Sequence, residues 1–194
     1  MIKKVVLGKL KGSSFERTIC KKLSLWVSKN KRDDIFWRTN SSGGRYTVRK
    51  KVGLDTYNQA GDITNAHPEG EFLVNYFIFE LKSYKKINIW DFFKDQDKKT
   101  LLYEWWIKLN NECKNCNKIP ILIVKEDYKP VLLLTNSYFG NFLETHFNFH
   151  IRIIWKLDQE INIGLFDDLL KIDADCFKEK IQSDLLFLTF KRIK

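Results

Sequence analysis

The chain has 194 residues, of which 34 are lysine or arginine and 24 are aspartate or glutamate, so its net charge is +10. A hydrophobic fraction of 44% with 14% aromatic residues excludes a disordered chain and predicts one domain with a core of its own. No apolar run approaches the roughly 20 residues of a membrane-spanning helix, and the lysine-rich start has no signal-peptide pattern. We therefore expect an intracellular protein with no membrane contact.

The positive charge is concentrated at the start of the chain. Residues 1–51 contain 15 lysines and arginines against three acidic residues, a net charge of +12, whereas residues 52–194 have a net charge of −2. Such a surplus attracts polyanions, nucleic acid first and anionic membrane second. The apolar face of the segment between Phe15 and Val27 has the size of a helix face that packs on a sheet, so we do not expect it to bind a membrane. DNA is therefore the favoured partner. The candidate phosphate contacts are Arg17, Lys21, Lys22, Arg38, Arg45, Arg49, Lys50 and Lys51.

The first half of the chain predicts one helix followed by strands. Ser13 and Glu16 have the spacing of a capping box, and apolar residues recur at helical spacing as far as Val27. The pattern then predicts a strand at 34–38, a polar loop at 39–45, the start of a strand at 61–64, a turn at 67–71 and a strand at 72–82.

The second half predicts helices and strands in alternation. The pattern indicates a long helix over about 90–113, strands at 119–125 and 130–134, a helix starting near 137, a strand at 151–155, a short helix over 166–172 and an apolar run at 185–190. Together the elements predict an α/β domain, with a central mixed sheet flanked by helices. We expect a single domain over 1–194, with its core at about 10–135 and a C-terminal elaboration at about 136–194. Trp105 and Trp106 are more typical of core packing or of a dimer interface than of base stacking.

Four cysteines include one close pair, Cys113 and Cys116. A structural zinc site needs four ligands, which His146 and His150 would have to complete. The remaining cysteines are far away in the sequence, so we expect no zinc.

Two carboxylates and a lysine form the strongest candidate for chemistry. On a strand, Glu80 and Lys82 point to the same face, about 6.6 Å apart. Asp62 would bring a second carboxylate from a neighbouring strand that a hairpin joins to this one. Two carboxylates suit Mg²⁺, with Mn²⁺ as a substitute, and a bound metal neutralises phosphate and lowers the pKa of an attacking water while a lysine orients that water.

The acid-x-Lys pattern alone is weak, because a surface ion pair has the same spacing. It also occurs at Asp97–Lys99, Glu112–Lys114 and Asp127–Lys129. Only Glu80–Lys82 lies inside a predicted strand with an acidic residue just upstream.

Three motifs together resemble the PD-(D/E)XK nuclease superfamily. They are Gly12-Ser13-Ser14-Phe15-Glu16, Gly61-Asp62-Ile63 and Glu80-Leu81-Lys82-Ser83. The first motif, with the loop Ser41-Ser42-Gly43-Gly44, is closest in pattern to the archaeal-type Holliday junction resolvases. The resemblance covers about residues 10–125. It departs from the pattern at Gly61, where many members have proline.

This resemblance implies a restriction-endonuclease-like core and a role for each matching residue. Asp62, Glu80 and the backbone carbonyl of Leu81 would bind the metal, and Lys82 would position or activate the water. Glu16 would hold a metal-bound water or a second metal, unless it is only the capping partner of Ser13. Gln96 would face the site or be an ordinary surface residue, and Ser41 and Ser42 would face DNA or belong to a linker.

The resemblance also implies a magnesium-dependent endodeoxyribonuclease that acts on branched or double-stranded DNA as a homodimer. Two alternatives stay open. One is a sequence-specific restriction-type endonuclease, whose recognition element would come from residues 135–194. The other is a DNA-binding protein that has the fold without catalysis, although an intact set of Glu16, Asp62, Glu80 and Lys82 argues against it.

Overall fold

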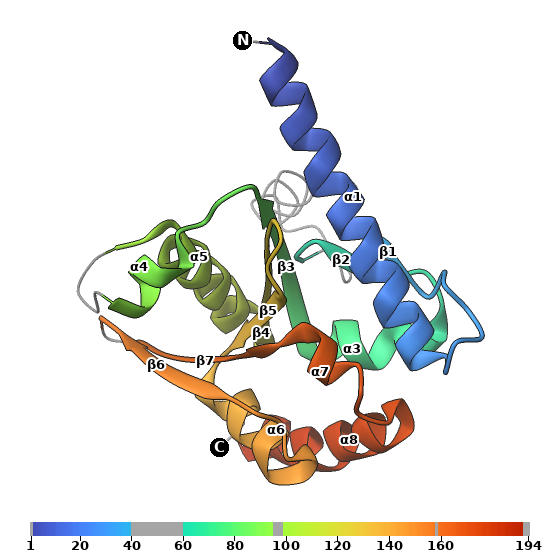
Figure 1. The fold of residues 1–194 in the computed structure, drawn as a ribbon. Coiled ribbons are helices and arrows are strands. Elements are labelled where there is room, and N and C mark those ends of the chain that lie inside the picture. The colour runs from blue at the N-terminus through green and yellow to red at the C-terminus, as the bar shows by residue number, and fades with distance from the viewer. Residues whose placement is uncertain (1, 40–59, 95–98, 158, 192–194) are drawn as a thin grey trace.

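The structure is a computed structural model that describes residues 2–39, 60–94, 99–157 and 159–191. Helices cover both faces of a five-stranded sheet, and a two-stranded sheet lies beside it (Figure 1). The helices are α1 (Ile2–Val27), α3 (Glu71–Tyr76), α4 (Ile89–Lys94), α5 (Leu101–Cys116), α6 (Ser137–Phe147), α7 (Phe166–Leu169) and α8 (Ala174–Lys191), with a 3-10 turn, η1, at Pro68–Gly70. The strands are β1 (Phe36–Arg38), β2 (Ile63–Asn65), β3 (Phe77–Tyr84), β4 (Ile119–Glu126), β5 (Val131–Thr135), β6 (Arg152–Lys156) and β7 (Gln159–Leu165).

The central sheet is mixed and has the strand order β3-β4-β5-β7-β6. β3 and β4 run parallel and are connected through α4 and α5, whereas the other neighbouring strands pair antiparallel. The predicted fold class, an α/β domain with a mixed sheet flanked by helices, is therefore confirmed. Among the described strands β3 is at the edge of this sheet, so one side of its backbone is available to another segment.

Two apolar clusters pack on opposite faces of the sheet. One lies under α1, α3, α6, α7 and α8 and includes Phe79 and Leu81, and the other lies under α4 and α5 and includes Ile78. Successive side chains of a strand alternate between faces, so Glu80 and Lys82 share the face of Ile78 and α5. This alternation turns the two charged side chains away from the larger core.

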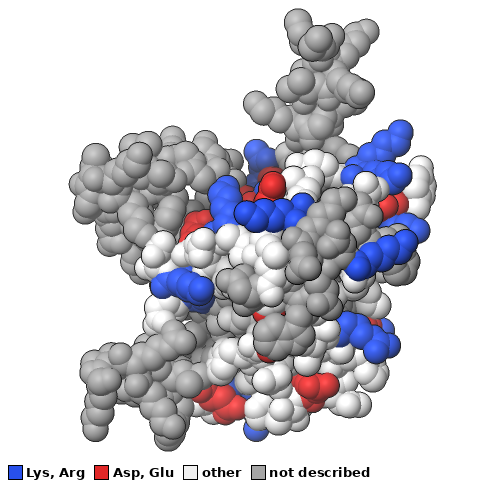
Figure 2. All heavy atoms as spheres, turned by 90° about the vertical axis from the view of Figure 1, so that its left-hand side faces the viewer, with Lys and Arg blue, Asp and Glu red and all other residues white. Residues whose placement is uncertain are grey.

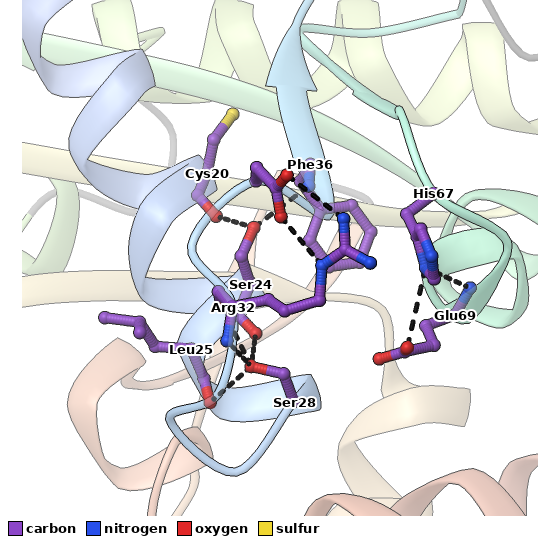
Figure 3. Close-up of polar contacts among 9 residues, drawn as sticks. Cys20, Ser24, Leu25, Ser28, Arg32, Phe36, His67 and Glu69 are labelled. Carbon is purple, nitrogen blue, oxygen red and sulfur yellow. Dashed lines mark hydrogen bonds and ion pairs between the residues drawn. The ribbon is translucent and has the colours of Figure 1, made fainter.

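A buried serine attaches β1 to α1 (Figure 3). The Ser24 hydroxyl donates to the Cys20 carbonyl at 2.8 Å and accepts the backbone N–H of Phe36 at 2.9 Å. One turn later, the Ser28 hydroxyl accepts the N–H of Arg32 at 2.9 Å. These contacts fix the connection between α1 and β1, which in turn places Arg38 beside α1.

Helix α1 begins at Ile2, so the predicted helix start at Ser13 is wrong. Ser13 lies inside the helix, where its hydroxyl accepts a hydrogen bond from Arg17 at 3.3 Å. A side-chain cap satisfies backbone N–H groups that have no partner, and these exist only in the first turn of a helix. The capping role considered for Glu16 is therefore excluded.

The predicted strand over 72–82 is helical in its first part, as α3, and becomes β3 at Phe77. Phe72, Leu73 and Val74 of α3 are all buried in the larger apolar cluster. The η1 turn that precedes α3 begins at Pro68, whose fixed φ suits the first position of such a turn. The predicted hairpin between the Asp62 segment and β3 is also wrong, because β2 pairs with β1.

Two further differences concern the second half of the chain. The predicted helix over 90–113 is two helices, α4 and α5, and α5 begins where the Thr100 side chain accepts the N–H of Tyr103. Strand β7 was not predicted, although it is the partner of both β5 and β6. The described elements after residue 135 thus belong to the same sheet and to the helices that cover it.

Candidate active site

Asp62 is held against the edge of β3 by two hydrogen bonds, and a third joins it to the residue after β1. Its backbone N–H donates to the carbonyl of Phe79 at 2.7 Å, and its own carbonyl accepts the N–H of Thr39 at 2.9 Å. Its side-chain Oδ2 accepts the N–H of Leu81 at 2.8 Å, and the residue is only 6% exposed. The N–H and C=O of one strand residue project to the same side. The Leu81 carbonyl therefore points to the edge where Asp62 lies.

The backbone conformation at Gly61 explains why this chain has glycine where many members of the superfamily have proline. Its φ is +80°, and a Cβ at this position would lie 2.5 Å from the carbonyl oxygen of Phe79 and 2.8 Å from Cγ2 of Ile78. Proline is restricted to a φ near −65°, so it is incompatible with this backbone. Glycine permits the close approach that brings Asp62 onto β3.

Glu80 and Lys82 form an ion pair on the α5 side of β3, and both side chains are largely buried, at 17% and 24% exposed. Burial alone lowers the pKa of Lys82, but the charge and hydrogen bond of Glu80, together with the charge of Asp62, outweigh it and raise the pKa. Lys82 is therefore a cation at neutral pH. In this arrangement it neutralises a carboxylate and can orient a polar ligand, but it is a poor base.

Glu16 approaches the same edge from α1. It forms an ion pair with Arg38 of β1, with 3.1 Å between Nη1 and Oε2. Burial, followed by the charge of Asp62, raises the pKa of Glu16 against the opposing effect of Arg38. One turn along α1, burial and then the charges of Glu16 and Asp62 raise the pKa of the Cys20 thiol to about 12. This thiol stays neutral and is part of the core.

The donor set fits a magnesium ion. Among the residues that the structure describes, no group of three or more His, Cys, Asp or Glu side chains is close enough to hold a metal. Mg²⁺ is usually bound by one or two carboxylates, with water and substrate phosphate as its other ligands. Asp62 and Glu80, with the carbonyl of Leu81 at the same strand edge, match that requirement and do not match a closed all-protein cage.

The predicted DNA contacts are distributed unevenly. Arg38 reaches the site, whereas Lys21 and Lys22 form ion pairs with Asp33 and Asp167 at 2.9 Å and 2.7 Å. Arg17 is exposed on α1. On the face shown in Figure 2, lysine and arginine side chains are interspersed with acidic ones across the described surface. The other predicted residues lie outside the described part of the chain: Ser41, Ser42, Arg45, Arg49, Lys50, Lys51 and Gln96.

A family model described as "Phage putative PDDEXK endonuclease" matches residues 8–181. The chain belongs to this family. The match agrees with the superfamily expected from the three motifs, and it extends beyond residue 125, where the sequence resemblance ended. No curated protein and no solved structure matches the chain. Within the described residues, no helix is both long enough and apolar enough to cross a membrane.

Membership in this family makes the arrangement at β3 a candidate nuclease site. The sequence analysis missed two of its features. It did not find the bond from the Leu81 N–H to Asp62, for which the only signal was a glycine directly before an acidic residue. It named Arg38 only as a phosphate contact, because a pairing with Glu16 across 22 residues leaves no trace in local sequence.

Proposed function

We propose that the protein is an endodeoxyribonuclease that uses Mg²⁺, or Mn²⁺ in its place, to hydrolyse phosphodiester bonds in branched DNA. The observation that supports this most is the hydrogen bond from Leu81 to Asp62. It joins the Asp62 carboxylate to the strand that carries Glu80 and Lys82, next to Glu16 of α1. A structural ion pair at the surface would not require a third and a fourth charged group in the same half-buried place.

Asp62, Glu80 and the Leu81 carbonyl would hold the metal ion, with Glu16 holding a metal-bound water or a second ion. When bound, the metal neutralises the phosphate and lowers the pKa of a water. Lys82 orients that water and balances the charge that develops on the phosphate. Its raised pKa supports this role, because a lysine that stays protonated donates hydrogen bonds and does not accept protons.

We further propose a resolvase-like selectivity and a homodimer, acting inside the cell. The support is the Gly12-Ser13-Ser14-Phe15-Glu16 pattern of the first helix, together with the symmetry of a four-way junction, which offers two equivalent strands to two equivalent active sites. The sequence-specific alternative would take its recognition element from residues 135–194. The described elements there contribute to the central sheet and its helical layer, so we favour selectivity for DNA structure.

Cleavage of end-labelled DNA tests the proposal. A four-way junction, a flap, a linear duplex and a single strand are incubated with the protein in magnesium and in EDTA. We expect magnesium-dependent cuts, with paired symmetric cuts near the centre of the junction. Cuts at one sequence in the linear duplex would instead indicate a restriction-type enzyme. Binding of every substrate without cleavage in magnesium or manganese would indicate a non-catalytic DNA-binding protein.

A further inference from the structure

An aromatic platform lies at the end of β3, next to the catalytic residues. We define it as Tyr84, Trp105 and Leu101. The ring of Tyr84 lies against that of Trp105, with centroids 4.9 Å apart and planes at 33°. Tyr84 is 43% exposed and Leu101 is 44% exposed, so the platform is open to solvent.

The platform is continuous with the catalytic strand. Glu80, Lys82 and Tyr84 alternate with residues of the opposite face, so all three side chains are on the α5 side of β3. Lys82 and Tyr84 are two residues apart, about 6.6 Å along the strand. A base can reach Tyr84 from a phosphate that lies near Lys82, because a base and its own phosphate are separated by a single sugar.

Positive charge lies next to the platform along the chain. Lys85 and Lys86 follow Tyr84 directly, and both are exposed. In the described part of the chain neither of them has an ion pair, in contrast to Lys21 and Lys22 of α1. Two acidic residues also lie beside Tyr84: Glu126 of β4, whose Oε2 accepts the backbone N–H of Ile87 at 3.4 Å, and Asp127, whose backbone N–H donates to the Tyr84 carbonyl at 3.2 Å. The two exposed lysines therefore give this end of β3 cations that can bind a phosphate backbone.

We infer that Tyr84, supported by Trp105, is a stacking site for an unpaired base of the DNA beside the phosphate that is cut. This inference rests on the proposed nuclease function and adds a substrate feature to it: the enzyme takes DNA with a base free of its partner at the cleavage position. Aromatic rings beside lysines bind single-stranded nucleic acid in this way, since every base offers a flat face. A second copy of the chain suits the platform less well, because a symmetric contact would bring the lysines of both copies together.

The test uses the full chain in EDTA, so that binding is measured without cleavage. The probes are two duplexes that contain 2-aminopurine, a fluorescent base that is quenched by stacking. In one probe the 2-aminopurine is unpaired, and in the other it is paired. Tyr84→Leu removes the ring, Tyr84→Phe keeps it, and Tyr138→Leu removes an exposed tyrosine from α6, which packs on the other face of the sheet.

We expect the wild type, Tyr84→Phe and Tyr138→Leu to quench the unpaired probe and to bind it more tightly than the paired one. Tyr84→Leu should lose the quenching and bind the unpaired probe roughly tenfold more weakly, with its affinity for the paired probe unchanged. Thermal unfolding of each variant checks that it is folded.

Three results would overturn the inference. The first is that the wild type does not quench the fluorescence of the unpaired probe. The second is that Tyr84→Leu weakens the binding of both probes equally, and the third is that light scattering shows Tyr84→Leu to be a monomer where the wild type is a dimer. The first result does not depend on any variant. The proposed function is decided separately, because a wild type that cuts DNA without quenching the probe refutes the stacking site alone, and one that quenches without cutting refutes the nuclease alone.

Discussion

Asp62 and Leu81 are joined by a 2.8 Å hydrogen bond between a buried carboxylate and a backbone N–H, across 19 residues of chain. The bond uses the edge of β3 on which none of the described strands pairs with the backbone of Leu81. It therefore places a carboxylate beside Glu80 and Lys82 without a β-hairpin. The predictions below follow from this contact and from the residues around it.

Gly61→Ala should destabilise the protein and abolish nuclease activity. The new Cβ would meet the backbone oxygen of Phe79 at 2.5 Å, at a φ that side chains rarely adopt. We expect a loss of about 1–3 kcal/mol in the free energy of unfolding, measured in urea. Gly12→Ala is the matched control, since a Cβ there meets nothing within 4 Å and the helix should gain about 0.5–1 kcal/mol. Equal stabilities of the two variants would contradict this account of Gly61.

Ser24→Ala should loosen β1 from α1 (Figure 3). The substitution leaves the N–H of Phe36 without its acceptor in a fully buried place, at a cost of about 1–3 kcal/mol. Thr18→Ala, one of the exposed positions of α1, removes a hydroxyl bound only to the carbonyl of Ser14 and should change stability by less than about 0.5 kcal/mol. Denaturant unfolding of both variants makes the comparison, and a Ser24→Ala protein as stable as the wild type would disprove the attachment.

Lys82→Ala should separate metal binding from catalysis. Removing the cation releases Glu80 and takes away a positive charge that opposes the metal, so Mg²⁺ or Mn²⁺ should bind more tightly in calorimetric titration. The cleavage rate should nevertheless fall by roughly 10²–10³-fold, because the residue that we propose orients the water is gone. Weaker metal binding by this variant would show that Lys82 supports the metal site in some other way.

The raised pKa of Glu16 predicts a pH dependence of stability. The folded protein binds a proton more readily at Glu16 than the unfolded chain does, mainly because of burial and then the charge of Asp62. The contribution of Glu16 to stability is therefore lost as pH rises from the ordinary pKa of glutamate through the raised value. Glu16→Gln should remove this decline. Unfolding of both proteins across this pH range measures it, and parallel curves would contradict the shift.

Nuclease activity should depend on pH in the opposite direction, because in the proposed function it is the ionised Glu16 that would hold a metal-bound water. It should fall as pH drops through the raised pKa of Glu16. Arg38→Met removes the cation that opposes this shift and should move the acidic limb of the rate profile to higher pH. Arg32→Met, which breaks an exposed ion pair with Asp34, should leave the limb in place. An unmoved limb in Arg38→Met would show that Glu16 does not control it.

The sequence predicted the fold class and the residues gathered at β3, but it did not predict how they come together. The side chains of residues 79–82 alternate between the two faces of β3, as predicted, because this alternation is a local property of a strand. The path of the chain from Asp62 to β3 depends on non-local packing. The apolar residues of α3 suit either a strand or a helix, and only their burial between layers decides for the helix.

Polar residues caused two further errors. Ser13 and Glu16 have the spacing of a helix cap, yet ten or so residues before them continue the same helix. β7 contains polar residues at its start and the buried Asn162, so its pattern does not alternate clearly. At β7 the local pattern was overridden by pairing with β5 and β6, which the sequence does not display.

The most direct test of the central claim is magnesium-dependent DNA cleavage by three proteins: the wild type, Glu80→Gln and Asp127→Asn. The last changes the acid of another acid-x-Lys pattern, Asp127–Lys129, which lies in the turn between β4 and β5. We predict that the wild type and Asp127→Asn cut DNA at similar rates, while Glu80→Gln binds DNA without cutting it. Cleavage by Glu80→Gln at the wild-type rate would contradict the assignment of the active site to the edge of β3.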